Sequence, residues 1–176
     1  LRQVEGKRPL RQQLYALARQ PLGVRLSHPD CLLQRWSANY TPAMAERIAE
    51  WNNRRADVTV TVNDLKITDN AFQAALQEKN VLARADAVAG KFFFTIKRGV
   101  AVPELPGFDT GWFLAADPAV ANAVDLLRAQ PGLRVLDACA APGGKTALLA
   151  GRMEGQGVLQ AWEPQNERRA RMSENL

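Results

Sequence analysis

Residues 137–146 read Asp-Ala-Cys-Ala-Ala-Pro-Gly-Gly-Lys-Thr, or DACAAPGGKT in one-letter code. The apolar run LRVL (133–136) precedes this stretch, and ALLAGRM (147–153) follows it. An apolar run, a glycine-rich turn and apolar residues at helical spacing predict a strand, a tight turn and a helix. Because the start of a helix attracts anionic groups, many proteins bind a nucleotide at such a turn. The neighbouring sequence indicates which nucleotide this turn accepts.

A second strand, VLQAW (158–162), follows the helix predicted over 144–153. A strand, a helix and a parallel strand in about 30 residues form the opening βαβ unit of a doubly wound sheet. The last stretch, PQNERRARMSENL (164–176), predicts the next crossover helix. Two parallel strands leave both edges and both faces to be covered. We therefore expect the sequence to contain only the start of this α/β fold.

Three interpretations of the glycine turn compete. GGKT matches the end of a phosphate-binding P-loop, but that motif needs a glycine at the position of Cys139. The dinucleotide fingerprint G-x-G-x-x-G is absent. The third interpretation is the S-adenosylmethionine loop of methyltransferases, in which an acid ends the first strand and small residues pass under the cofactor. The residues favour this third interpretation, with a P-loop ATPase as a weaker alternative.

Each part of the turn suits S-adenosylmethionine. Asp137 can accept hydrogen bonds from turn N–H groups or from the ligand's ammonium group. The unpaired N–H groups at the start of the following helix can bind the methionine carboxylate, and Lys145 can add positive charge or hold the loop. Glu163, at the end of the second strand, can accept from both ribose hydroxyls. Four small residues leave room for a ligand against the backbone: Ala140, Ala141, Gly143 and Gly144.

The preceding residues, 28–115, predict a small α+β unit. Apolar spacing predicts a helix after Pro29 and a second helix from Thr41 to the Asn52-Asn53 pair, with Trp36 and Trp51 at packing positions. The alternating segment 58–63 predicts a half-buried strand, and Thr68 or Asp69 can cap a helix. Two more strands are expected at 81–88 and 91–99, where core packing of Phe92–Phe94 is favoured over base stacking. A turn-rich loop is expected over 103–112, and a helix from Asp117.

Composition limits the class of protein. Hydrophobic residues make up 47% of the 176 residues and charged residues 23%, as in ordinary globular proteins. With one histidine (His28) and two cysteines (Cys31 and Cys139), the chain offers no metal site and no disulfide framework. It has no run of about 18 apolar residues that would span a membrane, and no signal peptide. We therefore expect a cytoplasmic protein whose sequence starts inside a longer chain.

The net charge of +5 is concentrated near the N-terminus. Such a basic segment favours contact with a polyanion, although a solvated linker is an equally good interpretation. Against Glu5 and Asp30, residues 1–36 carry Arg2, Lys7, Arg8, Arg11, Arg19, Arg25 and Arg35.

The turn DACAAPGGKT resembles the cofactor motif of the RNA cytosine-5 methyltransferases, the Nol1/Nop2/Sun family. Three further stretches are similar to its bacterial 16S ribosomal RNA branch, in the family's order: SHPDCLLQRW (27–36), NNRR…VTVN (52–63) and LPGFDTGWFLAAD (105–117). The resemblance implies a class I, Rossmann-like methyltransferase fold that is truncated here. It also implies S-adenosyl-L-methionine as cofactor, held by Cys139, Ala140, Ala141, Pro142, Gly143, Gly144, Lys145 and Glu163.

By the same resemblance the chain has three parts. Residues 1–27 are the tail of a preceding helical, NusB-like domain, 28–115 contact RNA, and 116–176 begin the methyltransferase domain. The partner would be 16S ribosomal RNA, and the protein would act as a monomer without a metal or a membrane.

The resemblance also implies the chemistry. In this family a cysteine thiolate adds to carbon 6 of cytosine, so that carbon 5 can attack the sulfonium methyl group. Both catalytic cysteines of the family lie in motifs after the cofactor loop, so no catalytic residue is expected within 1–176, and neither Cys31 nor Cys139 is expected to be the nucleophile. The alternative is a non-catalytic RNA-binding protein on a degenerate methyltransferase fold. The departures from the family pattern at Ala56-Asp57 and Thr61 would fit it.

Overall fold

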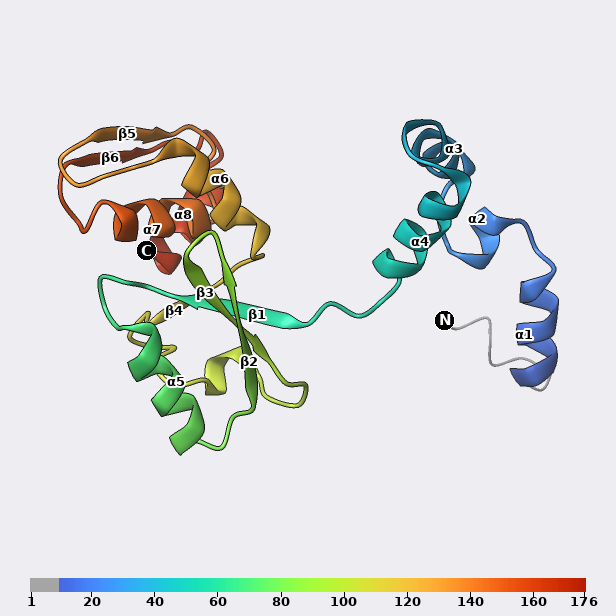
Figure 1. Cartoon of the computed structure of the whole chain (residues 1–176), viewed down its shortest axis with the longest axis horizontal. Coiled ribbons are helices and arrows are strands. Elements are labelled where there is room, and N and C mark those ends of the chain that lie inside the picture. Colours follow the sequence, from blue (N-terminus) through green and yellow to red (C-terminus); the bar gives the residue numbers. More distant parts are fainter. Residues whose placement is uncertain (1–9) are drawn as a thin grey trace. The chain divides into compact units, whose positions relative to one another are not determined.

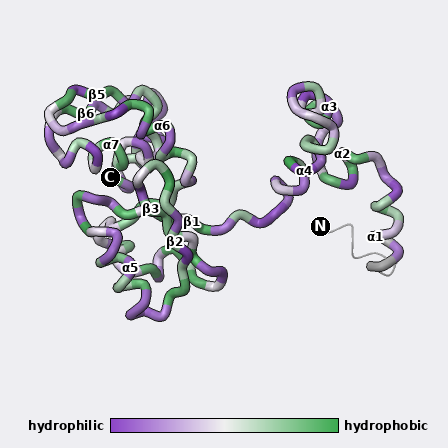
Figure 2. The backbone as a smooth tube through the Cα atoms, viewed as in Figure 1, coloured by the Kyte–Doolittle hydropathy of each residue, from purple (hydrophilic) through white to green (hydrophobic). Residues whose placement is uncertain are grey.

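The computed structural model describes residues 10–176, which fall into two compact units divided between Ala56 and Asp57 (Figure 1). The basic residues Arg2, Lys7 and Arg8 lie outside the described residues. The connection between the units, residues 53–57, is mostly hydrophilic (Figure 2). The sequence-based domain boundaries, after residues 27 and 115, stay a prediction.

The described part of the first unit is helical: α1 (Leu10–Ala18), α2 (Leu22–Arg25), α3 (Asp30–Asn39) and α4 (Pro42–Asn52). The Thr41 hydroxyl accepts from the backbone N–H of Met44 at 3.1 Å, which confirms the predicted start of α4. Ala45 and Ala49 of α4 are fully buried, and such small side chains allow α3 to pack closely. The expected burial of Trp51 is wrong, because this indole is 68% exposed on the opposite side of α4.

A four-stranded antiparallel sheet opens the second unit, in the order β2-β3-β1-β4. Its strands are β1 (Val58–Val62), β2 (Ala83–Val88), β3 (Lys91–Ile96) and β4 (Phe113–Ala115), and α5 (Asp69–Glu78) lies against one face (Figure 1). Thr68 caps α5 by accepting from the backbone N–H of Ala71 at 3.3 Å. Short β4, which the sequence did not predict, pairs with β1 through Thr61 and Leu114.

The core of this sheet lies between the strands and α5. Phe72 of α5 is fully buried and meets the rings of Phe94 and Phe113 at centroid distances of 5.3 and 5.5 Å. Phe93 is also buried, whereas Phe92 is 45% exposed, so the core interpretation of this phenylalanine run holds for two of its three members. Thr61 is fully buried and donates to the Phe92 carbonyl at 2.9 Å, so it is a packed strand residue.

The predicted βαβ unit follows. It consists of α6 (Ala119–Leu127), β5 (Arg134–Asp137), α7 (Gly144–Arg152), β6 (Val158–Ala161) and α8 (Asn166–Asn175). β5 and β6 are parallel, with Asp137 opposite Ala161. Leu148 and Leu149 of α7 pack with Val124 of α6. The parallel pair and its crossover helix confirm the α/β fold class, and they bring the ends of both strands to the same edge.

Arg152 connects the two halves of the second unit. Its guanidinium donates to the carbonyl of Ala89, between β2 and β3, and to the Asp125 carboxylate of α6 at 3.2 Å. The end of α7 therefore contacts the antiparallel sheet, while its start lies at the glycine turn. Within residues 10–176, no helix has both the length and the apolar composition that crossing a bilayer requires.

Candidate cofactor site

Asp137 fastens both ends of the glycine turn to the end of β5. Its carboxylate is 6% exposed and accepts from the backbone N–H of Cys139 at 3.2 Å and from the Thr146 hydroxyl at 2.8 Å. Of the two partners considered for Asp137 from the sequence, the turn N–H is confirmed, and the ligand's ammonium group stays a prediction. The sequence analysis did not predict the contact of Thr146 with Asp137. The one indication in the sequence is that Thr146 is the last residue of the GGKT motif.

The start of α7 offers unpaired backbone donors. No side chain of residues 10–176 caps this helix, so its first N–H groups remain available to an anion. A Cβ atom at Gly144 would meet nothing within 4 Å. Gly143, by contrast, has φ +109°, and a Cβ there would lie 3.2 Å from the Leu176 side chain. The open space is therefore at Gly144, whereas Gly143 is required by the backbone.

The remaining turn residues shape the loop. Ala140 and Ala141 are 1% and 4% exposed, so their side chains pack inside it. Lys145 donates from Nζ to the Cys139 carbonyl at 3.2 Å, which is the loop-holding role of the two considered for it. Pro142 and the free thiol of Cys139 are exposed.

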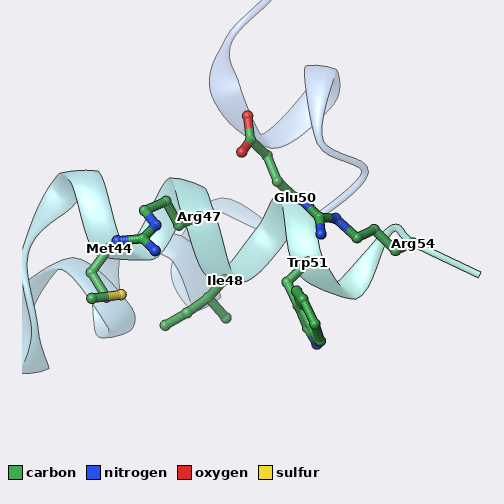
Figure 3. Close-up of a pocket in the computed structure, with 6 residues that line it drawn as sticks. All are labelled: Met44, Arg47, Ile48, Glu50, Trp51 and Arg54. Carbon is green, nitrogen blue, oxygen red and sulfur yellow. The ribbon is translucent and has the colours of Figure 1, made fainter. Parts of the chain in front are cut away.

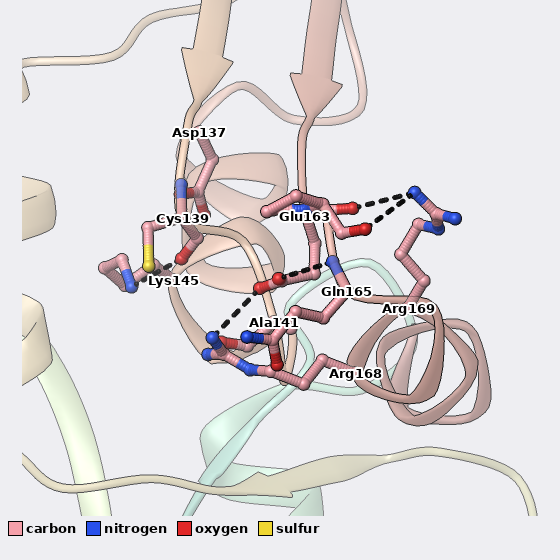
Figure 4. Close-up of polar contacts among 9 residues, drawn as sticks. Asp137, Cys139, Ala141, Lys145, Glu163, Gln165, Arg168 and Arg169 are labelled. Atoms are coloured by element: carbon pink, nitrogen blue, oxygen red, sulfur yellow. Dashed lines mark hydrogen bonds and ion pairs between the residues drawn. The ribbon is translucent and has the colours of Figure 1, made fainter.

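Glu163 follows β6 and lies beside the turn, with only 2% of its side chain exposed. One oxygen accepts from the backbone N–H of Gln165 at 3.1 Å, and the other pairs with the Arg168 guanidinium at 3.3 Å (Figure 4). A carboxylate has about four acceptor positions, so each oxygen keeps one for a ligand hydroxyl.

Backbone contacts hold the two strand ends together. The Trp162 N–H donates to the Asp137 carbonyl at 2.9 Å, and the Ala140 N–H donates to the Trp162 carbonyl at 3.2 Å. Two side chains of α8 also reach the turn: Arg168 donates to the Ala141 carbonyl at 3.2 Å, and Asn175 to the Pro142 carbonyl at 2.8 Å. The structure thus places the predicted residues 139–145 and Glu163 on adjacent segments. The contacts of the α8 arginines could not be predicted from the sequence, because the segment ERRAR (167–171) contains three arginines and nothing in the sequence shows which of them reaches the turn.

A second ionic cluster lies away from the turn. Lys91, 7% exposed, pairs with the Asp64 carboxylate and lies 3.7 Å from Asp69. Burial raises the pKa of Asp69 above its ordinary value of 3.8, against the opposing effect of Lys91. Among the described residues, no donor forms a hydrogen bond with Asp69 Oδ1. No group of three His, Cys, Asp or Glu side chains in the described chain could hold a metal ion.

A groove of about 380 Å³ runs along the exposed side of α4 (Figure 3). Trp51 forms part of it, and the Arg54 guanidinium lies 5.0 Å from the centre of the Trp51 ring. Aromatic and arginine side chains of this kind stack on unpaired bases. The other lining residues are Met44, Arg47, Ile48 and Glu50.

Two family models match the chain. Residues 28–102 match the ferredoxin-like domain of RsmF/B-like methyltransferases, and residues 124–176 match the 16S rRNA methyltransferase RsmB/F family. A ribosomal RNA small subunit methyltransferase B from Erwinia tasmaniensis is 35% identical over 149 residues, which cover 85% of this chain and 34% of that protein. The chain thus spans about a third of the length of the curated relatives it matches.

Solved structures share the fold. A methyltransferase homologue from Pyrococcus horikoshii has a TM-score of 0.75 at 27% identity, over 88% of this chain and 50% of that one. NSun6 from the same organism, determined with the S-adenosylmethionine analogue SFG, has a TM-score of 0.75 at 14% identity, over 84% and 62%. These structures show a shared fold. The two family models, which match residues 28–102 and 124–176, and the curated relative show that the chain belongs to the RNA cytosine-5 methyltransferase family, which includes the 16S rRNA methyltransferases RsmB and RsmF.

Proposed function

We propose that the protein carrying this chain methylates carbon 5 of a cytosine in 16S ribosomal RNA, with S-adenosylmethionine as the methyl donor. The cofactor site is formed by residues 139–145 and Glu163. The observation that carries this proposal is a buried acid, Glu163, held beside a glycine turn whose helix has no side-chain cap. That arrangement offers acceptors for ribose hydroxyls next to donors for a carboxylate.

The residues present fit the cofactor. The space at Gly144 admits a ligand against the backbone, and the N–H groups at the start of α7 bind its carboxylate. Glu163 accepts from the ribose hydroxyls with the acceptor positions that Gln165 and Arg168 leave. Asp137 and Lys145 hold the turn in shape through the Cys139 backbone. When bound, S-adenosylmethionine supplies the methyl group.

Residues 28–115 supply the RNA contact in this proposal. The groove on α4 supports it, because Trp51 and Arg54 present a stacking surface beside a second cation, Arg47. The basic residues near the N-terminus add affinity for phosphate. The protein acts as a cytoplasmic monomer on ribosomal RNA.

A non-catalytic RNA-binding protein is the less favoured candidate, since the curated relatives are named as methyltransferases. The departure at Thr61 does not require it, because Thr61 is buried within the sheet.

Methyl transfer to unmodified 16S RNA, followed with a radiolabelled methyl group in the full-length protein, tests the activity directly. We expect label in 5-methylcytosine, and we expect the Cys31→Ser/Cys139→Ser variant to retain it, because neither thiol is proposed as the nucleophile and Cys139 contributes its backbone N–H and carbonyl to the turn. RNA binding without label would favour the non-catalytic alternative. Loss of label in the double variant, with unchanged affinity for S-adenosylmethionine, would assign the chemistry to one of these cysteines.

The salt dependence of RNA binding tests the basic segment. In the R11A/R19A/R35A variant, the slope of log affinity against log salt should become shallower by about 0.7–0.9 for each phosphate that is no longer neutralised. The matched control removes three arginines from the second unit, R128A/R134A/R171A, and should leave the slope nearer to wild type. Equal slopes in wild type and R11A/R19A/R35A would show that the segment is only a linker.

A further inference from the structure

Arg168 joins the two segments that form the candidate cofactor site. Through Nη1 it pairs with Glu163 Oε2 at 3.3 Å, and through Nη2 it donates to the Ala141 carbonyl at 3.2 Å (Figure 4). One guanidinium therefore spans the end of β6 and the middle of the glycine turn. Its planar, two-nitrogen geometry suits such a bridge, which an ammonium group cannot reproduce.

Glu163 needs such a partner. A carboxylate that is 2% exposed loses most of its hydration, so its oxygens need donors from the protein in place of the lost water. The Gln165 N–H fixes one oxygen and Arg168 the other. With both oxygens held, the free acceptor positions of the carboxylate have a defined direction.

The neighbouring arginine, Arg169, makes different contacts. Arg169 donates to the Glu163 backbone carbonyl at 3.0 Å and does not contact the carboxylate. It therefore holds the chain after β6, whereas Arg168 holds the side chain that is proposed to meet the ligand.

We propose that Arg168 is a positioning residue of the S-adenosylmethionine site, which aims the Glu163 carboxylate at the ribose and holds the glycine turn at a fixed distance from it. This proposal rests on the proposed function of the same site. It adds a residue outside the turn, and it states that Arg168 acts on the cofactor through Glu163.

Calorimetric titration of the full-length protein with S-adenosylhomocysteine tests the proposal. Because Arg168→Ala removes a charge-assisted hydrogen bond to a buried group, it should weaken binding by about ten- to a hundredfold. Arg168→Lys keeps the charge without the bridge and should fall between wild type and Arg168→Ala. Arg171→Ala removes the same charge from an exposed position of α8 and should bind as wild type does.

A double-mutant cycle separates positioning from a general structural role. In a Glu163→Gln background, Arg168→Ala should weaken binding much less than in wild type, since the carboxylate through which it acts is absent. The same fold-change in both backgrounds would overturn the proposal. So would wild-type affinity in Arg168→Ala when Glu163→Gln binds weakly. Absence of binding by the wild type would instead contradict the proposed function itself.

Discussion

Gly143 and Gly144 are adjacent in the turn, yet a side chain would meet different surroundings at each. At Gly143 the backbone has a positive φ, and a Cβ atom would press against Leu176. At Gly144 the Cβ position is open, and the residue begins α7. The sequence indicated that both glycines leave room for a ligand. The structure adds that only Gly144 can be substituted without disturbing the turn.

Gly144→Ala should therefore weaken S-adenosylmethionine binding without destabilising the protein. The added methyl group would lie where the ligand approaches, and steric overlap of about 1–3 kcal/mol corresponds to roughly a ten- to a hundredfold weaker affinity. Calorimetry gives the affinity and thermal unfolding gives the stability. Gly143→Ala is the control and should lower the unfolding temperature because of its positive φ. Unchanged affinity in Gly144→Ala would place the ligand elsewhere.

At the level of elements, most helices and strands were predictable from apolar spacing and caps. Thr41 caps the helix predicted to begin there, and of the two caps offered for the next helix, Thr68 or Asp69, Thr68 is the one observed. Strand β4 escaped prediction because three residues are too few to show alternation, and its pairing with β1 depends on contacts distant in sequence. The contacts of Arg168 could not be predicted for the same reason, because only the folded chain brings Arg168 to Ala141 and Glu163.

The first turn of α5 carries a pH-dependent contribution to stability. Because burial raises the pKa of Asp69, the folded protein retains this proton above pH 3.8, where the unfolded chain loses it. Stability from this group is thus present at low pH and is lost as pH rises through the folded pKa. Asp69→Asn should raise the unfolding temperature at neutral pH, and the difference should vanish below pH 3.8.

Thermal unfolding at a series of pH values checks this expectation. Asp64→Asn is the matched control, since its carboxylate pairs directly with buried Lys91, and it should lower stability at neutral pH. A lower unfolding temperature for Asp69→Asn at neutral pH would mean that its attraction to Lys91, 3.7 Å away, outweighs its burial.

Within the second unit, helix α7 links the glycine turn to the antiparallel sheet. Its first residue lies at the glycine turn, and Arg152 near its end holds the β2–β3 connection through the Ala89 carbonyl. Two separate family matches, one to the ferredoxin-like part and one to the methyltransferase part, fit this arrangement. The sequence predicted both parts but not the contact between them, because Arg152 and Ala89 are 63 residues apart.

Arg152→Ala should loosen this junction while it leaves the glycine turn intact. The pair with Asp125 is exposed, so its loss costs about 1 kcal/mol or less, and the main effect is local opening of the β2–β3 connection. Hydrogen exchange should accelerate around Gly90 and remain unchanged at residues 139–145. Equal protection around Gly90 in wild type and variant would show that Arg152 does not hold the hairpin.

The central claim is that the turn of residues 139–145, together with Glu163, binds S-adenosylmethionine, and competitive calorimetric titration of the full-length protein measures it most directly. We expect S-adenosylmethionine to bind in preference to ATP. In Glu163→Ala, the loss of two charge-assisted hydrogen bonds, each about 1.5–3 kcal/mol, should weaken binding at least about a hundredfold. Preferential binding of ATP would contradict the claim, and unchanged affinity in Glu163→Ala would contradict the ribose assignment.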